Sequence, residues 1–150
     1  MRLLASTDLA LRVLMRLAAG LDGQQMPGKR PLSVEILSRE LGGLSRHHLH
    51  KIVQDLAALG IVRTIRGAGG GVRLAVAPQT IRVGSLVRQL EGDQPLVECF
   101  RADGGSCVFS AACRLRGLLG GAREDFYRHL DRHSLADCLP PALDVPDRDA

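Results

Sequence analysis

The chain lacks several features that would point to other classes of protein. It contains no Trp, one Tyr and three Phe among 150 residues, so its core must be aliphatic, as a helical protein allows. No run of about 18 apolar residues occurs, and we therefore expect no membrane span. No charged segment followed by an apolar stretch and a cleavage site is visible near Met1. We accordingly expect no signal peptide and a cytoplasmic location.

Four cysteines are present, and thiols stay reduced in the cytosol, which favours metal binding or redox chemistry over a disulfide framework. Cys99, Cys107 and Cys113 form the spacing C-x7-C-x5-C within fifteen residues. This spacing is looser than the C-x2-C pairs of zinc ribbons, and three thiolates leave one coordination position to another donor. The pattern favours a reactive metal or iron–sulfur centre suited to sensing.

Charge is unevenly distributed along the chain. Residues 1–82 hold 12 Lys and Arg against 5 Asp and Glu, whereas residues 83–150 hold 8 against 11. A basic half joined to a mildly acidic half is expected of a nucleic-acid module with a regulatory or dimerising half. We therefore predict a DNA-binding domain over 1–82, a cluster-binding loop with a dimerisation helix over 83–138, and a disordered tail over 139–150.

Apolar periodicity and capping residues predict the helices of the basic half. The first helix, capped by Thr7, runs to about Ala19, and a loop follows over 20–31. Capping serines begin the next two helices: Ser33 begins a short one that ends at Gly42-Gly43, and Ser45 begins one that ends near Leu59.

Two strands are expected next, over 61–66 and 72–76, joined by the glycine-rich tip Gly67-Ala68-Gly69-Gly70-Gly71. A helix over 83–90, an irregular segment over 92–110 and a helix over 111–133 complete the prediction. The last helix has a long apolar face, which we expect to meet the same helix of a second subunit: Leu115, Leu118, Leu119, Ala122, Phe126 and Leu130.

Three helices followed by a glycine-rich hairpin is the order of a winged helix-turn-helix, and the predicted fold class is mainly α (α+β). We expect the polar face of the third helix to contact bases and phosphates in the major groove. The wing would place its arginines against the DNA backbone or minor groove. The predicted DNA-binding residues are Arg46, His47, His50, Lys51, Arg63, Arg66 and Arg73. An enzyme with a cysteine nucleophile would need a Cys–His pair, of which the sequence has no signature, and we expect no enzyme.

Four features of the sequence carry a family resemblance: TDLALRVLMRLA (7–18), SRHHLHKIVQDLAALGIVRTIRGAGGGVRLA (45–75), LVECF (96–100) and the cysteine spacing. Over about residues 2–138 the chain resembles the Rrf2 family of winged-helix regulators, in particular its nitric-oxide-sensing, iron–sulfur-dependent repressors. The resemblance implies a homodimer with one iron–sulfur cluster per subunit, 4Fe–4S with 2Fe–2S as the alternative. It also implies a two-fold-symmetric DNA operator, which is released when nitric oxide attacks the cluster.

Carried onto this chain, the resemblance implies that Cys99, Cys107 and Cys113 are thiolate ligands and that Asp8 completes the cluster from the other subunit's first helix. The helix dipole alone would also favour an acid at this place. Iron-responsive members of the family typically have Asn where this chain has Asp8, so Asp8 favours nitric oxide as the signal. Three alternatives stay open: an iron or redox signal, zinc or a reversible disulfide among the same cysteines, and Cys138 as fourth ligand in place of Asp8.

Overall fold

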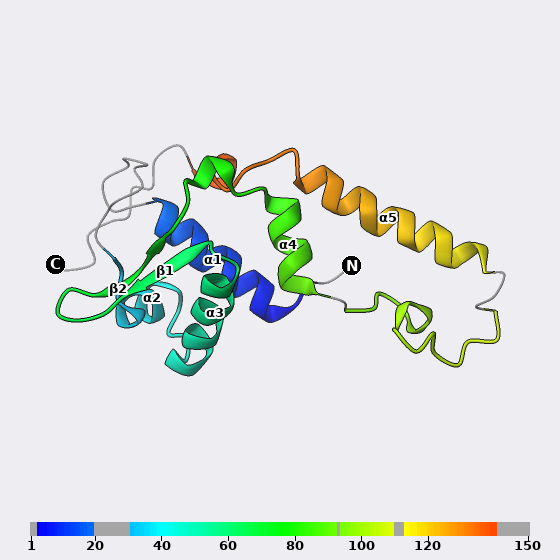
Figure 1. Cartoon of the computed structure of the whole chain (residues 1–150), viewed down its shortest axis with the longest axis horizontal. Helices are drawn as coiled ribbons and strands as arrows, with labels where there is room; N and C mark the ends of the chain where they lie inside the picture. Colours follow the sequence, from blue (N-terminus) through cyan, green and yellow to red (C-terminus); the bar gives the residue numbers. More distant parts are fainter. Residues whose placement is uncertain (1–2, 20–30, 93, 110–112, 141–150) are drawn as a thin grey trace.

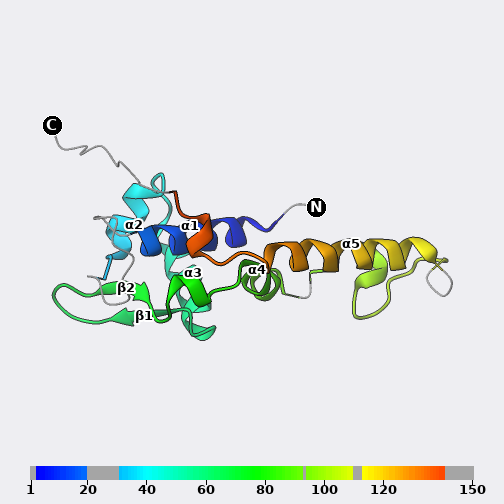
Figure 2. The same ribbon diagram turned by 90° about the horizontal axis from the view of Figure 1, so that it is seen from above.

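A computed structural model describes residues 3–19, 31–92, 94–109 and 113–140 of the chain. Helices α1 (Ala5–Ala19), α2 (Val34–Glu40) and α3 (Arg46–Ala58) form one body with the hairpin of strands β1 (Val62–Ile65) and β2 (Gly71–Leu74). Helix α4 (Val83–Glu91) connects this body to a loop, and α5 (Arg114–Leu130) extends away from the body, as Figure 1 and Figure 2 show. The order of these elements and the mainly helical class confirm the predicted winged helix-turn-helix.

The core of the body is aliphatic, as the scarcity of aromatic residues predicted. Leu14, Leu37, Leu49 and Leu56, one or more from each of the first three helices, are fully buried. The strands are antiparallel with Val62 opposite Leu74, and Val62 and Val72 point their side chains into this core. A bridge from Leu32, whose N–H donates to Val72 at 2.9 Å, attaches the segment before α2 to the outer edge of the hairpin.

The capping predictions for the second and third helices are confirmed. The Ser33 hydroxyl oxygen accepts from Ile36 N–H at 3.2 Å, and the Ser45 hydroxyl oxygen accepts from His48 N–H at 3.4 Å. Gly42 and Gly43 follow the end of α2 with φ of 90° and 76°, a region that favours glycine. These two serines set the start of the two helices that form the helix-turn-helix.

The cap predicted for the first helix is wrong. Helix α1 begins two residues before Thr7, at Ala5, and Thr7 lies inside it, fully buried, with no hydrogen-bond partner for its hydroxyl oxygen among the described residues. Packing of this helix face therefore outweighs the capping preference of threonine. The strands are also shorter than predicted, and Leu59 is partly exposed at the end of α3 rather than part of its buried stripe. The expected loop over 20–31 lies almost wholly outside the described residues.

Helix α5 ends at Leu130, three residues earlier than predicted, because the chain turns back toward the body. The His133 carbonyl oxygen accepts from Val83 N–H at 3.0 Å, and Leu135 N–H donates to the Ile81 carbonyl at 2.9 Å. Leu135 is fully buried in the main core, and a short 3-10 turn over Ala136–Cys138 follows it. The predicted tail over 139–150 lies mostly outside the described residues, although Leu139 packs against the core.

The junction of α4 and α5 orients the long helix. Gly84 packs so closely that a Cβ atom there would lie 2.1 Å from the Tyr127 carbonyl oxygen. Arg88 donates to both carboxylate oxygens of Glu124 at 2.9 and 2.7 Å, and its guanidinium lies 4.3 Å from the Tyr127 ring centroid. Asp131 accepts from Ser85 N–H at 2.6 Å. In the described part of the chain, no helix is long and apolar enough to cross a membrane.

The ion pair at this junction predicts a pH dependence of stability. Hydrogen bonding from Arg88 lowers the pKa of Glu124, so its stabilising contribution is complete above the pKa of the unfolded chain and is lost as the pH falls through the lowered folded value. We expect Glu124→Gln to lower the thermal unfolding midpoint at about pH 7, with a difference from wild type that shrinks toward about pH 4. Asp125→Asn is the control, because among the described residues Asp125 pairs with Arg128 on the same helix. A pH-independent difference for Glu124→Gln would contradict the role of the ion pair.

Candidate DNA-binding face and cysteine loop

Helix α3 presents one apolar and one polar face. Its apolar stripe, formed by Leu49, Ile52, Val53 and Leu56, is buried against the body. The polar side chains on the other face are all exposed, as predicted: Arg46, His47, His50 and Lys51. Arg46 forms an ion pair with Glu35 of α2, and Lys51 Nζ lies 3.6 Å from Asp55 Oδ2. Exposed pairs of this kind are weak, so a phosphate can replace either carboxylate at little cost.

The wing carries three arginines, two of which lie opposite each other on the hairpin. Arg63 of β1 lies directly opposite Arg73 of β2 in the hairpin register, and Arg66 follows β1 at the tip, exposed. The Nε atom of Arg73 is buried and has no hydrogen-bond partner among the described residues. Like charges at opposed positions destabilise a strand pair, so this arrangement favours an anion nearby. The structure therefore brings Arg63 and Arg73 together on the hairpin, with Arg66 exposed at its tip.

Cys99, Cys107 and Cys113 lie in the irregular segment between α4 and α5, here called the cysteine loop. Cys99 is 8% exposed within a 3-10 turn over Glu98–Phe100, Cys107 is half-buried in the loop, and Cys113 is half-buried as the N-cap of α5. All three are free thiols. Over residues 3–19, 31–92, 94–109 and 113–140, no three ligand-type side chains come together closely enough to hold a metal ion. The thiols are thus available on one loop, but this conformation does not bring all three together.

Two carboxylates organise this loop. Glu98 Oε1 accepts from Ser106 N–H at 3.2 Å and from the Ser106 hydroxyl at 3.0 Å. Asp103 Oδ1 accepts from Gly105 N–H at 3.0 Å, and Asp103 also accepts two hydrogen bonds from Arg101. The pKa of Glu98 is lowered mainly by the hydrogen bond from Ser106 N–H, and the pKa of Asp103 mainly by the hydrogen bond from Gly105 N–H. Both acids therefore accept these bonds as carboxylates at neutral pH.

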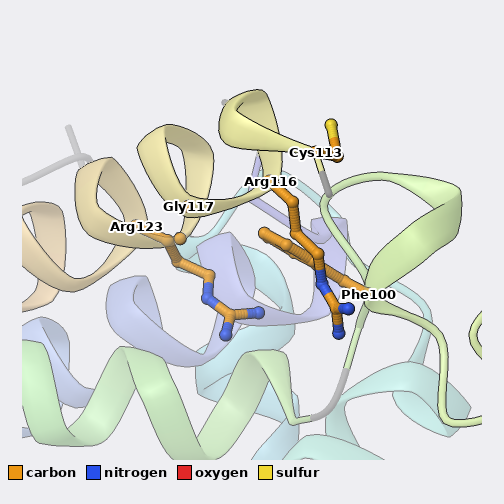
Figure 3. Close-up of a pocket in the computed structure, with 6 residues that line it drawn as sticks. Phe100, Cys113, Arg116, Gly117 and Arg123 are labelled. Carbon is orange, nitrogen blue, oxygen red and sulfur yellow. The ribbon is translucent and has the colours of Figure 1, made fainter. Parts of the chain in front are cut away.

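An open cleft lies beside Cys113. Its volume is about 420 Å³, and its lining consists of Phe100, Cys113, Arg116, Gly117, Gly120 and Arg123. Figure 3 shows the side chains of Arg116 and Arg123 extending from α5 on the side of Phe100. The Arg123 guanidinium lies 5.1 Å from the Phe100 ring centroid, and its buried Nε–H has no acceptor within hydrogen-bond distance among the described residues, with Glu124 Oε1 at 4.0 Å. In Figure 3 the Cys113 sulfur points away from the two guanidinium groups, which line the cleft as cations near the cysteine loop.

Asp8 is distant from these cysteines within the chain. It is exposed in the first turn of α1, where its Oδ2 lies 2.9 Å from the Arg12 guanidinium. In Figures 1 and 2, α1 and the cysteine loop lie on different sides of α4. The fourth cysteine, Cys138, lies on the 3-10 turn that packs on the body, where burial raises the pKa of its thiol. One subunit therefore brings neither Asp8 nor Cys138 to the loop.

Sequence reasoning missed Glu98, Ser106, Arg116 and Arg123. Arg116 and Arg123 are seven residues apart on a helix, which places them on one face, and this spacing could have been noticed. The pairing of Glu98 with Ser106 had no comparable signal, because loop conformations follow no fixed period.

Comparison with known proteins identifies related sequences over almost the whole chain. The model of the Rrf2 family, described as iron-dependent transcriptional regulators, matches residues 3–141. The HTH-type transcriptional regulator NsrR of Geobacillus kaustophilus is 44% identical over 93% of this chain and 90% of that protein. The HTH-type transcriptional repressor NsrR of Streptomyces coelicolor is 39% identical over 99% of this chain and 98% of that protein.

Solved structures show the same fold. The T. potens protein IscR superposes with a TM-score of 0.68 and 23% identity, covering 92% of this chain and 85% of that one. CymR, the global cysteine regulator of B. subtilis, superposes with a TM-score of 0.66 and 25% identity, covering 92% of this chain and 95% of that one.

Proposed function

The chain belongs to the Rrf2 family of iron-dependent transcriptional regulators and is a DNA-binding transcriptional repressor rather than an enzyme, and we propose that an iron–sulfur cluster which reacts with nitric oxide sets its affinity for operator DNA. The observation that carries this proposal is the set of three free thiols on one loop, beside a cleft with two arginines. NsrR relatives at 34–44% identity support an iron–sulfur-type regulator.

The DNA-binding surface in this proposal is the exposed face of α3 together with the wing. Arg46, His47, His50 and Lys51 would read base edges and contact phosphates in the major groove. Arg63, Arg66 and Arg73 would contact the backbone or minor groove on either side. The excess of seven positive charges in residues 1–82, 12 against 5, supports a large electrostatic contribution to affinity.

The protein acts as a homodimer in this proposal. Leu115 and Leu118 on the projecting half of α5 are 59% and 71% exposed, which is unusual for leucines so close together. A second copy of α5 would cover this face. Two copies would also give a protein two-fold axis to match a symmetric operator. Such a repressor acts where the chromosome lies, in the bacterial cytoplasm.

The donor set suits an iron–sulfur cluster. Cys99, Cys107 and Cys113 would hold it, 4Fe–4S in preference to 2Fe–2S, with Asp8 of the partner subunit as the fourth ligand. Arg116 and Arg123 would offset the charge of these anionic ligands from the cleft. When bound, the cluster supplies irons that nitric oxide attacks, most readily where an oxygen ligand can exchange. Asp8 would connect the cluster to α1, which packs against α3.

A second candidate is an iron- or redox-responsive regulator of the same fold, which the description of the family as iron-dependent favours. In that case the cluster, zinc or a disulfide among the same cysteines would report iron or oxidant instead of nitric oxide. A nitric oxide titration of the anaerobically purified protein, with operator binding as the readout, distinguishes the two.

The proposed DNA-binding face predicts which basic residues contribute to affinity for operator DNA. We expect Arg46→Ala and Lys51→Ala to weaken operator binding, and each lost phosphate contact to reduce the slope of log affinity against log salt by about 0.9. Arg128→Ala is the matched control, since Arg128 is exposed on α5 and pairs with Asp125. Equal losses of affinity in all three variants, measured by fluorescence anisotropy over a salt series, would refute the assignment to α3.

The ligand set predicts the visible absorbance of the protein purified without oxygen. Single Cys→Ser changes at Cys99, Cys107 and Cys113 should abolish the iron–sulfur chromophore, because thiolates are the usual ligands of such clusters. Cys138→Ser should keep it, since Cys138 lies on the body, away from the loop. A colourless Cys138→Ser protein with full iron supply would instead make Cys138 a ligand.

The proposed role of Asp8 predicts that its removal uncouples DNA affinity from the state of the cluster. Asp8→Ala should retain the chromophore, because water or a small thiol can occupy one iron, but its DNA affinity should no longer depend on the cluster. Arg12→Ala is the control: it removes the ion pair of Asp8 but leaves the carboxylate. Stopped-flow absorbance with nitric oxide and operator binding are the measurements. If Asp8→Ala behaves as wild type in both, Asp8 is only a charge at the helix end.

A further inference from the structure

The hydrogen bonds of Glu98 connect two positions that each adjoin a cysteine. Glu98 immediately precedes Cys99, and Ser106 immediately precedes Cys107. Because Glu98 Oε1 accepts from both the backbone N–H and the hydroxyl of Ser106, at 3.2 and 3.0 Å, it closes the chain between these positions into a loop of nine residues. Cys113 lies outside this loop, on α5.

Gly105 lies close against Glu98, although the Glu98 side chain is exposed to solvent. A Cβ atom at Gly105 would lie 2.7 Å from Glu98 Cγ and 3.0 Å from the Glu98 carbonyl oxygen. Its φ of 62° also favours glycine. Gly105 N–H in turn donates to Asp103, whose carboxylate binds Arg101. The loop therefore has its own network of bonds, although it belongs to no helix or strand.

We propose that Glu98 is a positioning residue that holds Cys99 and Cys107 as a preorganised thiol pair, to which Cys113 is added from a separate element. The proposal rests on the proposed function in that this pair is the first half of the cluster site. The Glu98–Ser106 bonds already restrict the conformations of the chain that carries Cys99 and Cys107. Less conformational entropy is therefore lost when one ligand binds both thiols. Cys113 is positioned by α5 and gains nothing from these bonds.

Thiol–disulfide exchange tests the pairing with no cluster present. Full-length protein with Cys113→Ser and Cys138→Ser is prepared without iron and equilibrated with reduced and oxidised glutathione. Each oxidised glutathione takes up two electrons and two protons from Cys99 and Cys107, which form one disulfide, and leaves as two reduced glutathiones. The ratio of oxidised to reduced protein at equilibrium, multiplied by the square of the reduced glutathione concentration and divided by the oxidised glutathione concentration, gives the effective concentration of one thiol at the other.

We expect Glu98→Ala to lower this effective concentration about tenfold, the effect of losing hydrogen bonds to a charged acceptor. Ser106→Ala should lower it less, because the backbone N–H bond remains. Glu98→Gln keeps an acceptor oxygen in the same place and should stay close to the parent protein. Gly105→Ala should mimic Glu98→Ala by displacing the carboxylate side chain.

The control is a second thiol pair in the same loop. With Cys99→Ser and Cys138→Ser, the remaining pair is Cys107 with Cys113, and Glu98→Ala should leave its effective concentration unchanged. Equal losses for both pairs would mean that Glu98 merely stabilises the loop, and no loss for the first pair would mean that it positions nothing; either result overturns the proposal. A wild-type protein without a chromophore would refute the proposed function but would leave this measurement intact.

Discussion

The close packing of α5 on α4 is the constraint on which the outer part of the molecule depends. Gly84 allows the two backbones to approach, and Arg88 and Asp131 connect the helices with charged hydrogen bonds. N-terminal to Glu124, α5 projects from the body, with the cysteine loop beside its first turns (Figure 1). Because the segment after α5 returns Leu135 to the main core, the projecting helix is attached to the body at its C-terminal end.

Pairs of arginines occur at two separate places. On the body, Arg63 and Arg73 face each other across the hairpin, and at the cysteine loop Arg116 and Arg123 line a cleft beside Cys113. Each of these places holds an arginine with a buried Nε atom for which the described residues provide no hydrogen bond. An anion at either place would satisfy this charge: nucleic acid phosphate at the first, thiolate ligands at the second.

Much of the fold could be predicted because its signals are local. The capping serines Ser33 and Ser45, the polar face of α3 and the order of helices and strands all depend on residues within a few positions of one another. Thr7 is the instructive failure, because it has the identity of a cap but is buried within α1. The three candidate cysteine ligands were visible from spacing and Asp8 only from the family resemblance, yet neither indicated Glu98 and Ser106, whose bonds depend on the path of an irregular loop.

By itself, the sequence determined the mainly helical winged fold, the basic character of its first half and the three-cysteine segment, since periodicity, charge and spacing are properties of neighbouring residues. Only the tertiary structure decided how α5 meets α4, where Leu135 is buried and which arginines line the cleft beside Cys113. Those contacts join residues far apart in the chain: Arg88 and Glu124 are 36 positions apart, and Ser85 and Asp131 are 46 apart. No local pattern encodes such pairs, because they form only when the helices pack.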